Sequence, residues 1–174
     1  LPEASSATTG AEGSDTTAAA DTTDAVDGSF DGEWAVAGGS EVGYRVEETI
    51  NGFAVTANGR TTDVEGSITI EGTRVTDGSF TVDMASIASD ESRRDNQFRG
   101  RIMAVDEFPT ATFVLTSPIE FGSTSATSAT ASGDLTLRGV TRPVTFDVTT
   151  SVREGRIGVL GQIPVTFADH GIPN

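Results

Sequence analysis

The sequence of 174 residues contains no cysteine and no lysine, and it has one histidine, His170. Without cysteine, the chain can form no disulfide, no thiolate nucleophile and no cysteine-based zinc or iron–sulfur site. A single histidine leaves most catalytic triads and metal cages incomplete. No run approaches the roughly 18 consecutive apolar residues that a membrane-spanning helix needs, so no such helix is expected.

Positive charge is scarce as well. The chain has 26 acidic residues against 11 basic ones, all of them arginine, which give a formal net charge of -15 and a pI near 4.2. Nucleic acids bind clustered Lys and Arg through the release of counterions, so this composition argues against nucleic acid as a partner. An anionic membrane surface is disfavoured for the same reason.

The first 28 residues are almost wholly Ala, Ser, Thr, Gly, Asp and Glu, with six acidic residues and no basic one. Such a segment buries too little apolar surface to offset its loss of conformational entropy. We predict a disordered acidic tether over 1–28, or else an ordinary low-complexity terminus. The sequence starts at Leu1 rather than Met, so we expect an upstream signal peptide, lipid anchor or membrane helix through which the protein is tethered to a membrane.

From Phe30 onward, short runs of alternating apolar and polar residues are separated by glycines, which is typical of half-buried antiparallel strands. Turns are predicted at Asn58-Gly59, Glu71-Gly72, Asp77-Gly78, Ser132-Gly133 and Glu154-Gly155. Many short strands at this spacing predict an all-β sandwich or up-and-down barrel over residues 30–174.

Residues 90–105 have a helical pattern instead. Phe98 and Ile102 are four residues apart, and Ser89-Asp90 is suited to capping a helix. We predict one short helix that lies across a mouth or a side of the barrel and ends before Pro109.

Several segments resemble the polyisoprenoid-binding proteins known as the YceI-like family. The most specific is Gly133-Asp134-Leu135-Thr136-Leu137-Arg138-Gly139-Val140-Thr141-Arg142-Pro143-Val144; the others are Trp34 with Ser40, Val42 and Tyr44, then residues 64–68, 82–87, 93–95 and 108–113. The resemblance covers nearly everything after the tail. It implies an exported, eight-stranded antiparallel up-and-down barrel similar to a lipocalin, with a long isoprenoid or other amphiphilic chain inside.

Two positions depart from the family pattern. The family often has His-Ser near the first strand, where this chain has Gly39-Ser40, so a polar role of that histidine is not carried over. The pattern also continues beyond Asn174 into a closing strand. We therefore expect the closing strand to be missing from this chain or to come from elsewhere.

The interior of a barrel of about eight strands accommodates either packed side chains or one slender ligand. Strand alternation predicts these inward-facing, ligand-binding residues: Val42, Tyr44, Ile68, Phe80, Val82, Phe113, Leu115, Leu135, Leu137, Val144 and Phe146. Arg138 and Arg142 flank the turn at 139–141 and are candidates to bind a phosphate or quinone head group, or else form surface ion pairs. Trp34 either lines the bore or anchors the barrel base. The one basic cluster, Arg93, Arg94, Arg99 and Arg101, either attracts a head group or partner or is a solvated helix face.

These expectations combine into a non-enzymatic protein that binds, carries or sequesters a polyisoprenoid lipid or prenyl quinone outside the cytoplasm, in the periplasm, in the cell envelope or as a secreted protein. Neither a metal nor any other cofactor is required. The alternative is a ligand-free interaction module, an accessory subunit of a membrane or respiratory envelope complex, whose barrel is filled by its own side chains. A homodimer or an envelope protein partner is compatible with either. An enzyme would need titratable groups that converge inside the bore, and His170 beside Asp169 is only a superficial acid–base pair.

Overall fold

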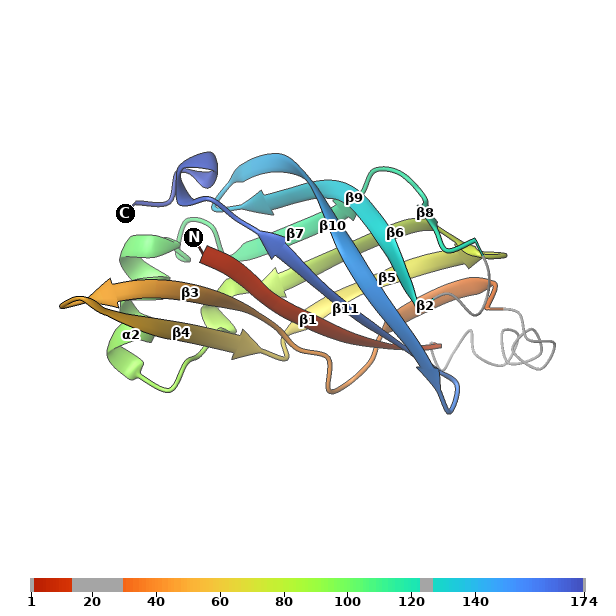
Figure 1. Ribbon diagram of the computed structural model, residues 1–174, viewed down its shortest axis with the longest axis horizontal. Coiled ribbons are helices and arrows are strands. Elements are labelled where there is room, and N and C mark those ends of the chain that lie inside the picture. Colours follow the sequence, from red (N-terminus) through yellow and green to blue (C-terminus); the bar gives the residue numbers. More distant parts are fainter. Residues whose placement is uncertain (1, 14–29, 123–126, 174) are drawn as a thin grey trace.

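Eleven strands join in one antiparallel sheet in the computed structural model, which describes residues 2–13, 30–122 and 127–173 (Figure 1). The strands are β1 (Pro2–Gly13), β2 (Gly32–Val36), β3 (Val42–Ile50), β4 (Phe53–Thr61), β5 (Val64–Glu71), β6 (Arg74–Asp83), β7 (Thr110–Leu115), β8 (Ile119–Glu120), β9 (Ser128–Leu137), β10 (Val140–Arg153) and β11 (Arg156–Pro164). The helical turns are η1 (Met84–Ser86), α2 (Ser92–Gln97), η2 (Phe98–Ile102) and η3 (Phe167–His170).

The sheet curls and meets itself at β1. Its strand order is β11-β10-β9-β7-β6-β5-β2-β1, and β1 also pairs with β11. The hairpin of β3 and β4 continues from β1, where Glu3 pairs with Arg45. The predicted class, an antiparallel lipocalin-like barrel with one short α-helix, is confirmed. The structure has three strands more than the eight expected. The expected first strand is divided into β2 and β3, the two-residue strand β8 is an addition, and β1 also joins the sheet.

Strand β1 differs from the expectation of a disordered tether over 1–28. Its backbone pairs with β11 from Glu3 opposite Pro164 to Glu12 opposite Arg156, and its end pairs with β2. The physical reason is that the edges of β11 and β3 carry backbone N–H and C=O groups that need partners, and a strand supplies them whatever its side chains are. β1 therefore closes the sheet between β11 and β2. Residues 1 and 14–28 of the expected tether lie outside the described residues.

The helical segment is shorter and less regular than the predicted 90–105. Helix α2 begins after Glu91, whose side chain accepts a hydrogen bond from the Arg93 N–H at 3.0 Å, so Glu91 rather than Ser89-Asp90 is the cap. After α2 the backbone widens into the π-helical turn η2, in which the Met103 N–H donates to the Phe98 carbonyl at 2.8 Å. Figure 1 places this segment at the end of the barrel from which the β3–β4 hairpin extends.

Two clusters of buried apolar side chains lie in the barrel. The first joins the helical segment to the sheet and includes Val64, Val82, Ile87, Phe98 and Met103. The second contains Trp34, Ile70, Val75 and Ile157. Both clusters contribute residues to the lining of the cavity described next.

Candidate ligand cavity

The barrel encloses a cavity of about 920 Å³. Its lining comes from strands around the sheet and from the helical segment, and it consists mainly of Val, Ile, Leu, Met and Phe side chains. At about 30 Å³ for each water-sized group, this volume corresponds to roughly thirty carbon atoms of an extended chain. The volume is also in the upper part of the range found for small-molecule sites.

Nine of the eleven residues predicted to face inward line the cavity: Val42, Tyr44, Ile68, Phe80, Val82, Phe113, Leu135, Leu137 and Phe146. Two do not. Leu115 packs against the Trp34 cluster instead, and Val144 is half-buried on β10 opposite Gly133. Ligand contact by any of these residues stays a prediction.

Glycines opposite aromatic residues help to keep the cavity open. Tyr44 lies across from Gly59, where a Cβ atom would be only 2.4 Å from the Tyr44 ring. A Cβ atom at Gly133 would likewise be 2.4 Å from the Phe113 ring. These rings therefore lie against the sheet over a position without a side chain, a known way to cover glycine in β-sheets. Rings held in this way occupy less of the lumen than rings that project across it.

Trp34 lines the cavity and also anchors one of the two apolar clusters. Its side chain is buried, and its indole Nε1–H donates to the Phe30 carbonyl at 2.8 Å. Ile70, Val75 and Ile157 surround it. Trp34 therefore both lines the cavity and anchors the apolar cluster, so the two alternatives predicted for it are compatible.

The charged residues among those that line the cavity are Glu47 and Glu48 of β3, Arg94 of α2 and Arg101 of η2. Glu47, Glu48 and Arg101 are exposed to solvent, so the cavity opens at this end, which we call the mouth. Just inside it, the Tyr44 ring stacks on Phe98 with 4.8 Å between the ring centroids. Burial raises the pKa of the Tyr44 hydroxyl above its usual range, and the negative charge of Asp95 raises it further.

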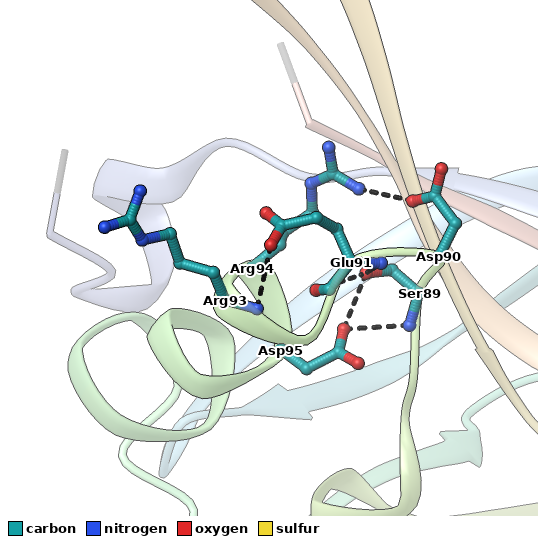
Figure 2. A network of polar contacts seen from close by, with 6 residues as sticks. All are labelled: Ser89, Asp90, Glu91, Arg93, Arg94 and Asp95. Atoms are coloured by element: carbon teal, nitrogen blue, oxygen red, sulfur yellow. Dashed lines mark hydrogen bonds and ion pairs between the residues drawn. The ribbon is translucent and has the colours of Figure 1, made fainter.

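A network of polar contacts holds the start of α2 beside the mouth (Figure 2). Asp95 Oδ1 accepts hydrogen bonds from the Ser89 hydroxyl at 2.6 Å and from the Ser89 N–H at 2.8 Å. These bonds lower the pKa of the buried Asp95 carboxyl, against the effect of burial. Arg94 donates to Asp90 at 2.6 Å; burial of Arg94 acts to lower its pKa, but this bond and the nearby negative charges raise it overall. Arg94 therefore keeps its positive charge.

Arg138 and Arg142, the predicted head-group residues, are not among the residues that line the cavity. Arg142 donates from Nε to the Asp169 carbonyl at 2.9 Å, and Arg138 donates from Nη1 to the Gly171 carbonyl. The Arg138 guanidinium also lies 5.8 Å from the centre of the Phe108 ring. Both arginines therefore hold η3 and the residues after it against the barrel.

His170 belongs to the same attachment. It is 2% exposed, and its Nδ1 lies 3.1 Å from the Val140 carbonyl oxygen. This contact gives His170 a structural position at the end of η3. Within the described residues, no group of three or more His, Cys, Asp or Glu side chains could hold a metal ion.

Sequence reasoning did not commit to Arg94 and Arg101 as residues of the cavity. The available signal was that they belong to the one basic cluster of an acidic chain. What the sequence could not show is that the helical segment packs over the end of β3 and so brings two of those four arginines to the mouth.

The family model for the YceI-like domain matches residues 34–174 of this chain. The chain belongs to the YceI-like family. A protein of Shewanella denitrificans described as a UPF0312 protein is 33% identical over 124 residues, which are 66% of this chain and 63% of that protein. The alignment to a second UPF0312 protein, from Pseudomonas putida, is 36% identical and spans 50% of this chain and 45% of that protein. The YceI-like chain thus spans about half to two thirds of the length of these relatives.

Solved structures share the fold of this YceI-like chain. Burkholderia cenocepacia BcnA superposes with a TM-score of 0.54 at 16% identity, covering 70% of this chain and 94% of BcnA. The Campylobacter jejuni YceI protein superposes with a TM-score of 0.55 at 17% identity, covering 66% of this chain and 70% of that protein. The resemblance stated from the motifs is confirmed. Among the described residues, no helix has the length and apolar character required to cross a membrane.

Proposed function

We propose that this YceI-like protein binds a polyisoprenoid or a similar long-chain amphiphile inside its barrel, without catalysis and outside the cytoplasm. The observation that carries the proposal is the cavity of about 920 Å³ with its mainly aliphatic and aromatic lining. Membership of a family whose fold is a binding fold supports it. A chain of about thirty carbons, or six isoprene units, matches the volume.

The apolar chain of the ligand supplies most of the affinity in this proposal. Each buried methylene contributes about 0.8 kcal/mol, so thirty carbons offer roughly 24 kcal/mol before the costs of ordering and of leaving a lipid environment. A solvent-exposed arginine at the mouth adds only about 0.2–1 kcal/mol through a head group. The length and width of the cavity, rather than a single charge, therefore set selectivity.

The alternative function, a ligand-free interaction module, predicts a barrel filled by its own side chains. A cavity of this size does not fit that prediction. The location outside the cytoplasm rests on the resemblance to exported proteins, and cell fractionation of the full-length protein tests it.

Native mass spectrometry of the purified full chain tests lipid binding directly. We expect a co-purifying lipid mass, and a rise in Tm when a prenyl quinone is added. The absence of both would refute the proposal.

The double variant Ala111→Leu with Ala131→Leu adds six carbons to two buried lining positions, which reduces the volume by about a fifth. It should lower the response to long prenyl chains more than to short ones. Ala88→Leu, at an exposed position that does not line the cavity, is the matched control.

A further inference from the structure

The tip of the β3–β4 hairpin exposes two large apolar side chains beside the mouth. Phe53 is 75% exposed and Ile50 is 49% exposed. Between them, Asn51 and Gly52 both have positive φ values, of 52° and 84°, which produce a tight two-residue turn. Ile50 also lines the cavity, so the exposed tip adjoins the lumen at the mouth.

The same end of the molecule differs from the rest in charge. The hairpin, residues 42–61, and the helical segment, residues 89–102, carry six arginines and five acidic residues together. The whole chain has 11 basic and 26 acidic residues, so these two segments are close to neutral while the remainder is strongly acidic. Figure 2 shows the Arg93 side chain pointing away from the polar network, and Arg93 and Arg101 are both exposed.

We propose that this end of the protein docks on the surface of a phospholipid bilayer. The side chains of Ile50 and Phe53 enter the interfacial layer, while Arg93 and Arg101 face lipid phosphates. The acidic remainder is repelled by the phosphates and so turns the mouth toward the lipid. A long apolar ligand then moves between bilayer and cavity without crossing water. The transfer of a ligand between bilayer and cavity rests on the proposed function, but docking on the bilayer does not.

A bilayer fits the tip better than a protein partner does. Stable protein interfaces bury at least about 1,200 Å² in total, and two side chains on a narrow hairpin supply a small part of that area. Shallow insertion into a lipid surface, in contrast, needs only a few apolar side chains with basic residues beside them. The overall charge of -15 argued against an anionic surface, but the uneven distribution of charge makes this end an exception.

Sedimentation of the full chain with vesicles of equal parts phosphatidylcholine and phosphatidylglycerol tests the proposal. We expect the wild-type protein to sediment with the vesicles. Phe53→Ser should weaken binding about tenfold or more, since burial of a Phe side chain corresponds to at least that factor. The double variant Arg93→Gln with Arg101→Gln should weaken binding and reduce its dependence on salt. Val152→Ser is the matched control, because Val152 is 48% exposed near the β10–β11 turn at the opposite end of the barrel (Figure 1).

Failure of the wild-type protein to bind the vesicles would overturn the proposal. Equal losses for Phe53→Ser and Val152→Ser would overturn it too. A dimer that Phe53→Ser converts to monomer, with unchanged vesicle binding, would assign the tip to a second copy of the chain instead. The thermal shift caused by a short, water-soluble prenyl alcohol is measured on the same variants. If that shift persists while vesicle binding is absent from the wild-type protein, docking fails and lipid binding stands.

Discussion

Substitution of Asp95 by asparagine should weaken the attachment of α2 to the barrel in a pH-dependent way. Asp95 is 8% exposed, and its Oδ1 accepts both the hydroxyl and the backbone N–H of Ser89, at 2.6 and 2.8 Å. Asparagine has nearly the same shape and keeps an acceptor oxygen, but it removes the negative charge. Hydrogen bonds to a charged group contribute about 1.5–3 kcal/mol, against about 1 kcal/mol for neutral ones.

The expected loss of stability in Asp95→Asn is therefore about 1–3 kcal/mol near neutral pH. For a chain of this size, that loss lowers Tm by roughly 2–10 °C. The pKa of Asp95 is lower in the folded protein than in the unfolded chain, mainly because of the bonds from Ser89. The charge thus stabilises the fold above the unfolded pKa of about 3.9, and this contribution is lost as pH falls through the lower folded pKa.

Urea unfolding monitored by the fluorescence of Trp34 measures the effect. Wild type and Asp95→Asn should differ by a constant amount between about pH 5 and pH 7, and the difference should shrink below about pH 4. Asp90→Asn is the matched control: its side chain is 88% exposed in the ion pair with Arg94, so we expect about 0.5 kcal/mol or less. A difference between wild type and Asp95→Asn that is the same at pH 3 as at pH 7 would refute the reasoning.

Three further changes have defined outcomes. Gly59→Ala places a Cβ atom 2.4 Å from the Tyr44 ring and should move it from its stack on Phe98, which lowers stability by about 1–3 kcal/mol in urea unfolding; an unchanged midpoint would contradict the packing described. Deletion of residues 1–13 leaves edges of β3 and β11 unpaired and should lower Tm and cause self-association in size-exclusion chromatography, whereas a stable monomer would show that β1 is dispensable. Arg138→Gln removes the bond to the Gly171 carbonyl and should expose η3 to faster hydrogen exchange, with no change in vesicle binding.

The inner face of the barrel was predictable because a strand alternates its side chains strictly. Val42 with Tyr44, and Leu135 with Leu137, line the cavity as their alternation indicated. Val144 shows the limit of that rule, because it does not line the cavity. Alternation predicts which face of the sheet a side chain is on, but not whether the cavity extends as far as that residue. Arg138 and Arg142 show another limit, because no local pattern indicates that η3 and the residue after it, some thirty residues later, supply the carbonyl oxygens that they contact.

Glycine was the main source of error in the predicted turns. Asn58-Gly59 lies inside β4 and Ser132-Gly133 inside β9, where the glycines lie under the rings of Tyr44 and Phe113. Asp77-Gly78 lies inside β6 next to a β-bulge opposite Thr69 and Ile70. A glycine that makes room for a ring on the neighbouring strand has the same sequence signature as one that turns the chain, so only the tertiary structure separates the two.

The pairing of β1 with β11 also constrains how the molecule folds. Glu3 lies opposite Pro164, so closure of the barrel joins two residues that are 161 positions apart in the sequence. Contacts so distant along the chain are slow to form, because the loop entropy must be lost before the pairing energy is gained. During synthesis β1 must therefore wait until β11 has emerged before the two strands can pair. The β1–β11 pairing then forms after the local hairpins, so an apolar guest bound before the barrel closes need not pass through the finished mouth.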